Sequence, residues 1–334
     1  MADIELKTGT VVKGWEVIRR LGEGGCGAVF EVRSRSDNSR AAIKVEAVTR
    51  KRDEEILKME VHVLRRLTGR RHVCQLYASG KTNAFNFMVI TLLGENLSEM
   101  RRTCPDQYFT LGTAIRLTLQ CLDGIHSVHD IGFVHRDIKP SNYALGGNDN
   151  TQRTVFLLDF GLARQIENID DKGKRTIRDP RPSVPFRGTL RYCSLNAHRR
   201  MEQGRHDDLT SLMYMASEFI AGSLPWRNKN KEQTVQLKES TTDKKLLEKC
   251  PPNFIRIANH LKTLTYYKRP DYNLIKSELE KVKKEKHLKS TDPYDWEEGG
   301  QFYEHFQSRD LTEATMTPRE DDENREFEDG GTTG

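Results

Sequence analysis

The residues best suited to chemistry lie in residues 135–142, which read HRDIKPSN, and in an Asp-Phe-Gly triplet that begins at Asp159. Asp137 has the carboxylate needed to accept a hydroxyl proton, and Lys139 would neutralise a transferred phosphoryl group. Asn142 and Asp159 carry oxygen ligands of the kind that magnesium prefers. Phosphoryl transfer needs positioning and charge neutralisation more than covalent chemistry. The spacing of these residues therefore predicts a phosphotransfer site.

A glycine cluster in residues 22–29, which read GEGGCGAV, lies between two β-rich stretches. Backbone without side chains can close over phosphates and donate its N–H groups to them. In a dinucleotide-binding unit the same spacing would open a helix, whereas a second strand is expected here. A glycine-rich hairpin turn with no ligand would look the same. The candidate phosphate-contacting residues are Gly22, Gly24, Gly25 and Gly27.

A lysine on a predicted buried strand, Lys44 in residues 41–44 (AAIK), is typical of a contact to nucleotide phosphates. Such a lysine needs a counter-charge. The following helix offers Glu54, Glu55 and Glu60, and only Glu60 lies beside the apolar stripe, so it should face inward. The alternative is a surface lysine and a surface glutamate. The stripe consists of Ile56, Met59, Val63 and Leu67.

Two regions differ in their hydrophobic periodicity. Up to about residue 93 the pattern is mostly strand, with one helix over residues 54–67. Beyond residue 94 the pattern is helical, and residues 208–220 are apolar on nearly every side, which predicts a helix inside a domain. The sequence thus predicts a small sheet-rich part joined to a larger helical one. Strands are expected over residues 14–18, 28–32, 41–45 and 85–93.

Composition excludes several classes of protein. The chain has 334 residues, 36% hydrophobic and 31% charged, and its longest apolar run, residues 87–93, is far shorter than the roughly 20 residues that span a bilayer. Six cysteines stand apart without a C-x-x-C pair, so we expect free thiols. The first residues lack the pattern of a secretory signal, and the ends lack lipidation motifs. We therefore expect the protein in the cytosol or nucleus.

Charge is distributed unevenly along the chain. The formal net charge is +5, but nine acidic and three basic residues follow from Arg309 onward, which leaves +11 on the first 308 residues. A basic body favours acidic partners: nucleic acid, acidic protein surfaces or phosphorylated peptides. The acidic end, poor in aliphatic residues, is predicted to be disordered. Residues 310–329 could instead fold back on a basic groove and present Thr312, Thr315 and Thr317 as substrates.

These motifs resemble those of eukaryotic protein kinases, from about Gly14 to Tyr272, and Lys139 is the serine/threonine form. Residues 187–198, RGTLRYCSLNAH, are similar to the segment with which casein kinase 1 family members replace Ala-Pro-Glu. Further stretches look closest to the tau-tubulin kinase branch, and one of them includes Glu60, which the resemblance also implies as the partner of Lys44. These stretches are residues 14–17, 58–61, 204–209, 224–227, 231–233 and 292–297.

The resemblance implies an α+β, bilobal protein kinase fold. An N-terminal extension, residues 1–13, would precede a small N-lobe, residues 14–93, with a five-stranded sheet and one helix. Residues 94–298 would form the larger helical C-lobe, with the catalytic loop and activation segment. Residues 299–334 would be an acidic, disordered tail.

The resemblance also implies ATP and magnesium as cofactors, with Lys44, Glu60, Asp137 and Lys139 in catalysis and Asn142 and Asp159 on the metal. Adenine would lie against the hinge near Ile90, with backbone hydrogen bonds at Thr91 and Leu93. Its apolar walls would come from Leu21, Val29, Ala42 and Leu145.

In casein kinase 1 relatives, the position matching Arg191 helps to bind a phosphate or carboxylate on the substrate. We therefore expect an anion site at Arg181, Arg187 and Arg191, because arginine binds such groups bidentately. A solvated loop without a ligand is the alternative. Three departures from the family pattern are Cys26 at the tip of the glycine loop, Met213 in place of a glycine and Cys193 in place of an alanine.

The expected function is that of a monomeric serine/threonine kinase that transfers the γ-phosphate of ATP to acidic or already phosphorylated protein segments. A catalytically weak kinase-like scaffold, docking acidic partners through its basic activation segment, is the main alternative. A small-molecule phosphotransferase shares part of the site but is not expected to carry Lys139 or that segment. Resemblance points to cytoskeletal substrates, a cytoplasmic location with access to the nucleus, and neither membrane nor specific nucleic-acid binding.

Overall fold

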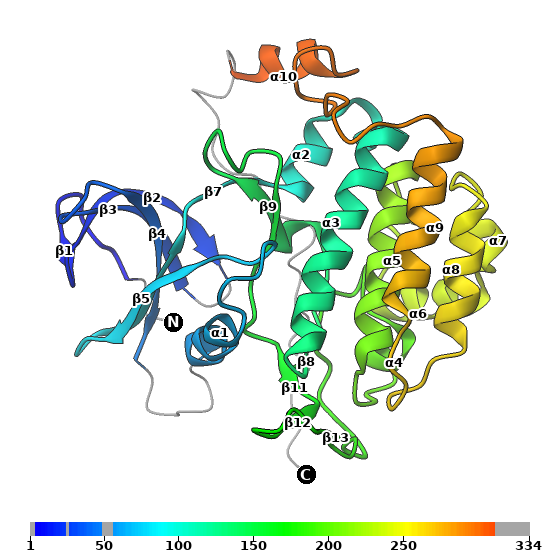
Figure 1. The fold of residues 1–334 in the computed structure, drawn as a ribbon, viewed down its shortest axis with the longest axis horizontal. Coiled ribbons are helices and arrows are strands. Elements are labelled where there is room, and N and C mark those ends of the chain that lie inside the picture. Colours follow the sequence, from blue (N-terminus) through cyan, green and yellow to red (C-terminus); the bar gives the residue numbers. More distant parts are fainter. Residues whose placement is uncertain (1–3, 25–26, 49–55, 311–334) are drawn as a thin grey trace. The chain divides into compact units, whose positions relative to one another are not determined.

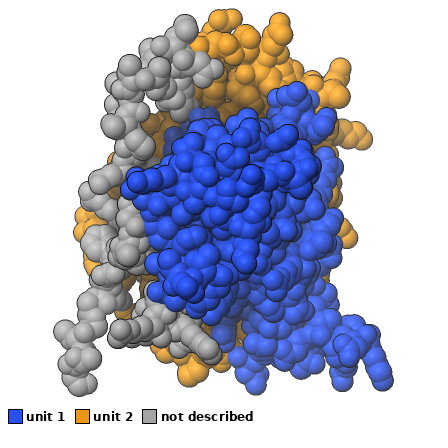
Figure 2. All heavy atoms as spheres, turned by 90° about the vertical axis from the view of Figure 1, so that its left-hand side faces the viewer, with its two compact units in different colours: residues 1–99, 119–136, 140–179 blue, residues 100–118, 137–139, 180–334 orange. Residues whose placement is uncertain are grey.

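The computed structural model describes residues 4–24, 27–48 and 56–310. The chain separates into two compact units (Figure 2). The first unit consists of residues 1–99, 119–136 and 140–179, and the second of residues 100–118, 137–139 and 180–334. The sequence placed a boundary at residue 93. Residues 140–157 belong to the first unit because they pair with its strands, by Leu93 with Gly146 and by a bridge from Val73 to Leu157.

The main sheet of the first unit has six antiparallel strands within the described residues, in the order β1-β2-β3-β4-β6-β5 (Figure 1). Five strands were expected, and the sixth is the two-residue β1, which pairs with the start of β2. The strands are β1 (Val11–Val12), β2 (Trp15–Gly24), β3 (Gly27–Ser34), β4 (Arg40–Ala47), β5 (Leu76–Lys81) and β6 (Phe85–Thr91).

Side chains alternate between the two faces of the sheet along β3, β4 and β6, so the two faces carry different residues. One face carries the buried core, with Phe30, Ile43 and Val89 at paired positions. On β4, Ala42 and Lys44 therefore point to the opposite face. The register pairs Lys44 with Val29 and Ala42 with Ile90, and directly paired residues share a face.

Helix α1 (Ile56–Arg66) buries Leu57, Glu60, Val63 and Leu64. The predicted stripe was correct at Val63 but wrong at Met59, whose side chain is exposed, because the buried face is rotated toward Leu57 and Leu64. Glu46 of β4 holds the start of the helix: its Oε1 accepts hydrogen bonds from the N–H of Ile56 at 2.8 Å and of Leu57 at 3.3 Å. Glu54 and Glu55 lie outside the described residues.

Smaller sheets complete the first unit. One has the order β10-β9-β7, and two pairs join β8 with β11 and β12 with β13. The strands are β7 (Leu93–Asn96), β8 (Phe133–Val134), β9 (Tyr143–Gly146), β10 (Val155–Leu157), β11 (Arg164–Gln165), β12 (Glu167–Ile169) and β13 (Arg175–Ile177), and a 3-10 helix covers Pro140–Asn142.

The second unit is helical and is built around α5 (Arg205–Ala221), which is buried along most of its length. This confirms the buried helix predicted from residues 208–220. Helices α2 (Leu97–Thr103) and α3 (Leu111–Asp130) run from one unit into the other. The others are α4 (Leu195–His198), α6 (Lys231–Ser240), α7 (Asp243–Leu246), α8 (Asn253–Lys262), α9 (Tyr272–Glu285) and α10 (Tyr303–Asp310), with a 3-10 helix at Pro105–Gln107.

Helix α10 lies in the segment expected to be disordered, so regular structure continues to Asp310. The segment before it is fixed to the start of α3. Asp295 accepts hydrogen bonds from the Thr110 N–H at 2.8 Å and the Thr113 hydroxyl at 2.8 Å, and Arg116 lies over the Tyr294 ring at 4.2 Å. Residues 311–334, with the proposed substrate threonines, lie outside the described part.

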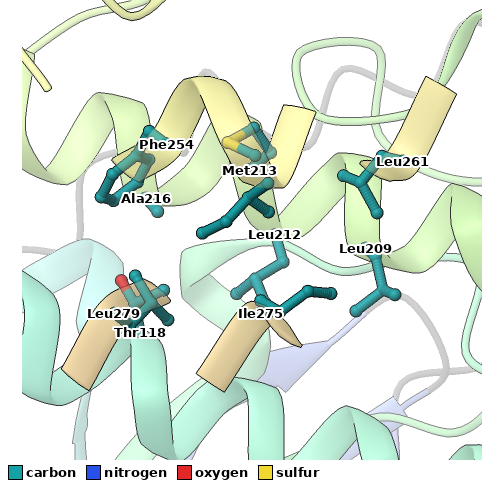
Figure 3. Close-up of a pocket in the computed structure, with 10 residues that line it drawn as sticks. Thr118, Leu209, Leu212, Met213, Ala216, Phe254, Leu261, Ile275 and Leu279 are labelled. Atoms are coloured by element: carbon teal, nitrogen blue, oxygen red, sulfur yellow. The ribbon is translucent and has the colours of Figure 1, made fainter. Parts of the chain in front are cut away.

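An apolar pocket lies between α5, α8 and α9, with Thr118 of α3 also in its lining (Figure 3). Met213 lines it, so the residue that departs from the family pattern fills part of this space. Five cysteines fall in the described ranges, and all five are free thiols, as expected; Cys26 lies outside. No helix in the described ranges is both long and apolar enough to cross a membrane.

Candidate active site

The glycine-rich strands β2 and β3 pair closely, with Gly22 opposite Val29 and Gly24 opposite Gly27. Gly27 has φ +141°, and a Cβ there would lie 1.9 Å from the Val45 carbonyl oxygen. A side chain at this position is thus excluded both by conformation and by space. Gly25 and Cys26, which the sequence places at the tip, lie outside the described residues.

Lys44 and Glu60 form the ion pair expected from the sequence. The Lys44 Nζ is 2.5 Å from Glu60 Oε1, and the two side chains are 12% and 2% exposed. The pKa of Glu60 is raised to about 7, because burial and the nearby charge of Asp159 together outweigh the opposing effect of Lys44. The pair is therefore fully ionic only above neutral pH.

The residues expected around adenine belong to β2, β3, β4, β6, β7 and β9. Ala42 and Leu145 are buried, while Leu21 is exposed. Pairing of Leu93 with Gly146 places β9, and with it Leu145, beside the predicted hinge. The Thr91 N–H donates to the Gln75 carbonyl oxygen at 3.1 Å, so this N–H is already used within the sheet and would not contact a nucleotide.

The two predicted metal ligands lie on loops that are hydrogen-bonded to each other: the Leu158 N–H donates to the Asn142 carbonyl oxygen at 2.9 Å. Asn142 is buried, and Asp159 has φ +60°, with its Oδ1 accepting from the Gly161 N–H at 3.2 Å. An amide oxygen and a carboxylate are hard ligands suited to magnesium, which usually takes its remaining ligands from phosphates and water. The donor set therefore fits this ion.

His135 and Arg136 hold the catalytic loop in place. The buried His135 ring lies 2.9 Å from the Leu158 carbonyl oxygen and packs edge-on against Phe160 at 5.4 Å. Arg136 has φ +69° and donates from Nε to the Leu162 carbonyl oxygen at 2.7 Å. Non-glycine residues held at positive φ gather at functional sites, where the surrounding structure enforces them.

Asp137 lies in the second unit, where two donors hold its carboxylate. Lys139 Nζ is 3.0 Å from Oδ2, and the Thr189 hydroxyl donates to Oδ1 at 2.7 Å. One oxygen thus meets a cation and the other a neutral hydroxyl, which fixes the orientation of the carboxylate. The sequence singles out Thr189 only as part of residues 187–198 and predicts no role for it, because its partner is 52 residues away.

Two of the three arginines expected to bind substrate anions have acidic partners in the second unit. Arg181 forms hydrogen bonds to both oxygens of Glu202, at 2.5 and 3.1 Å. Arg191 lies 3.8 Å from the fully buried Glu218, which also accepts from the Tyr192 hydroxyl at 2.6 Å. Arg187 is exposed. Two of the three arginines therefore already lie beside buried carboxylates, and the anion site stays a prediction.

The activation segment, from residue 172 to residue 191, has four more basic residues, which lie in the first unit on and around the β12–β13 hairpin. Arg175 pairs with Glu167 at 2.8 Å, and Arg178 donates to Asn168 Oδ1 at 2.8 Å. Lys172 and Lys174 are exposed at the hairpin turn. The arginines thus stabilise the hairpin, and the lysines leave positive charge at its tip.

The chain matches the model of the protein kinase domain family over residues 15–285. It is 39% identical over 299 residues to a probable serine/threonine-protein kinase of Dictyostelium discoideum, a match that covers 89% of this chain but 59% of that relative. It is 35% identical over 249 residues to an inactive tau-tubulin kinase of Caenorhabditis elegans, a match that covers 72% of this chain and 86% of that relative. It is 30% identical over 298 residues to a casein kinase I homolog of Schizosaccharomyces pombe, a match that covers 84% of this chain and 64% of that relative.

The chain belongs to the protein kinase domain family, within the casein kinase 1 group. Its fold is accordingly the α+β, bilobal kinase fold inferred from the sequence. The family uses ATP and magnesium in general, and its named relatives are serine/threonine kinases.

Proposed function

We propose that the chain is an active serine/threonine protein kinase that transfers the γ-phosphate of ATP to serine or threonine in acidic protein segments. The observation that carries the proposal is the Asp137 carboxylate, oriented by Lys139 and Thr189 so that it can accept a hydroxyl proton. The Lys44–Glu60 pair supports it as a charged contact for phosphates. A bound magnesium ion would supply neutralisation of phosphate charge.

An acidic substrate is favoured by charge rather than by a built anion site. The first 308 residues carry a net charge of +11, and Arg187, Lys172 and Lys174 are exposed. Substrate segments that are already phosphorylated would be attracted by the same positive charge. Cytoskeletal substrates are proposed from the likeness to a tau-tubulin kinase. We also propose a monomer in the cytoplasm, with access to the nucleus and without membrane or specific nucleic-acid binding.

The test is magnesium-dependent incorporation of phosphate from ATP into casein, an acidic protein. The Asp159→Asn variant should lose incorporation by at least about a hundredfold, because it removes charge stabilisation from the metal site. Asp149→Asn, at an exposed loop position, is the matched control and should keep the natural rate. A folded natural chain that phosphorylates neither casein nor other acidic proteins would refute the proposal.

A kinase-like scaffold that docks acidic partners is the second candidate, favoured by the 35% identity to a relative named inactive. It predicts no ATP consumption by the natural chain and equal casein binding after Asp137→Asn. Turnover by the natural chain that Asp137→Asn abolishes would exclude it. Turnover of a sugar or drug but of no protein would instead indicate a small-molecule phosphotransferase.

A further inference from the structure

Residues 189–193 of the second unit form a turn. Its carbonyl oxygens accept hydrogen bonds both from N–H groups of the turn itself and from side chains elsewhere in the unit. The Thr189 carbonyl accepts from the N–H groups of Tyr192 at 3.0 Å and Cys193 at 2.9 Å. The Arg191 carbonyl accepts from Trp226 Nε1 at 2.8 Å. The turn begins with the residue whose hydroxyl orients Asp137. Its geometry therefore bears directly on that carboxylate.

Lys238 of α6 holds the two remaining anchored carbonyls of this turn. Its Nζ lies 2.7 Å from the Leu190 oxygen and 2.6 Å from the Cys193 oxygen, with His198 Nε2 at 3.2 Å. The three N–H donors of the ammonium group face these three atoms, and the Cys193 sulfur lies further off, at 3.9 Å. Its charge also faces the rings of Tyr214 and Trp226, at 5.3 and 5.4 Å.

A buried ammonium is costly unless it is hydrogen-bonded, and here carbonyl dipoles and aromatic faces compensate it in place of a carboxylate. This arrangement makes Lys238 a directional clamp, because it fixes the positions of two peptide groups at either end of the turn. An apolar side chain of the same length would fill the space without orienting either group. Lys238 was not among the residues singled out by sequence.

We propose that Lys238 is a positioning residue, which holds residues 189–193 so that Thr189 orients the Asp137 carboxylate for proton transfer. The inference rests on the proposed kinase function. It assigns to α6 a part in catalysis that does not involve contact with substrate or nucleotide.

The clamp should be sensitive to pH. Burial lowers the pKa of Lys238 to about 8, so the ammonium loses its proton just above neutral pH. Burial raises the pKa values of Cys193 and Tyr214 and lowers that of His198 to about 3, so these facing groups stay uncharged while Lys238 titrates. The other charges that act on this cluster are Lys231, Asp137, Asp207 and Asp243. Lys238 should therefore set a decline in kcat above about pH 8.

The experiment compares Lys238→Met, Lys238→Arg and Glu239→Gln with the natural chain, measuring kcat and KM for casein phosphorylation from pH 6.5 to 9.5. Lys238→Met should lower kcat between about tenfold and about a hundredfold, leave KM for ATP unchanged and lack the decline above pH 8. Lys238→Arg should recover part of kcat. Glu239→Gln, which loses only an exposed pair with Arg199, should match the natural chain. A Lys238→Met variant with natural kcat and pH profile would overturn the proposal.

Two further measurements separate positioning from a loss of folding. Thr189→Val and Lys238→Met should be non-additive in kcat, because both act through the same carboxylate. Hydrogen exchange at the amides of Tyr192 and Cys193 should accelerate in Lys238→Met, while exchange across β4 stays natural. Additive effects, or unchanged exchange at the turn, would contradict the clamp. An inactive natural chain whose turn still depends on Lys238 would refute the proposed function, but not the clamp.

Discussion

At the scale of single residues, Glu60 is held between two opposing effects. It is buried where a carboxylate favours its protonated form, yet Lys44 needs it ionised. Its pKa, raised to about 7, has opposite consequences for activity and for stability. Below pH 7 the folded chain takes up a proton that neutralises the partner of Lys44.

We predict that kcat/KM for ATP falls as pH drops below about 7, because this ratio follows the ionisation of the free enzyme. Glu60→Gln should lower kcat/KM by at least about tenfold at pH 8 and remove the dependence near pH 7. The control is Glu280→Gln, at an exposed pair on α9. A natural chain whose kcat/KM stays constant from pH 8 to 6 would contradict the assignment.

The same pKa makes a prediction for stability. Because the pKa is raised in the folded state, the contribution of Glu60 to the free energy of unfolding is fully present below about pH 4.5 and is lost as pH rises through 7. The free energy of unfolding of Glu60→Gln, measured with urea across this pH range, should lack this pH-dependent contribution. Activity and this contribution to stability therefore change in opposite directions across the same range.

At the scale of elements, the start of α3 depends on a segment almost two hundred residues further along. Asp295 accepts hydrogen bonds from the backbone and hydroxyl of Thr110 and from Thr113, and burial raises its pKa. Helix N-termini leave N–H groups unsatisfied, and a carboxylate there also suits the helix dipole. The 292–297 segment is therefore part of the folded domain.

Asp295→Ala should lower the free energy of unfolding by about 2 kcal/mol or more, because three donors lose a buried charged acceptor. Urea unfolding measured by circular dichroism would determine this change. Glu298→Ala, at an exposed carboxylate directly after this segment, should change the free energy of unfolding by less than about 0.5 kcal/mol. Equal values for the two variants would show that the segment does not cap α3.

Over the whole chain, positive and negative charge are separated along the sequence. The basic body and the acidic residues from Arg309 onward carry +11 and −6. Attraction between exposed charges is screened over about 10 Å at 0.1 M salt. Substrate binding by charge, and any competition from residues 311–334, should therefore weaken as salt is added.

The hypothesis that the acidic end competes with substrate predicts that deletion of residues 311–334 raises kcat/KM for casein a few-fold at low salt. The difference should vanish near 0.5 M NaCl. Truncated and full-length chains are compared in the same salt series. Identical rates for the two chains at every salt concentration would show that residues 311–334 do not compete with substrate.

The groups that phosphotransfer would require could be predicted from the sequence, because they stand at short and recognisable spacings: Asp137, Lys139 and Asn142 within six residues, and Lys44 on a strand before the helix of Glu60. Hydrophobic periodicity predicted a sheet-rich part followed by a helical part, and the resemblance to protein kinases implied the bilobal fold. Three contacts became visible only in the folded chain: Thr189 with Asp137, Glu218 beside Arg191, and Lys238 buried against the 189–193 turn. These contacts join residues from 27 to 52 positions apart, and no local pattern records which distant backbone carbonyl or carboxylate a side chain will meet once the chain has folded.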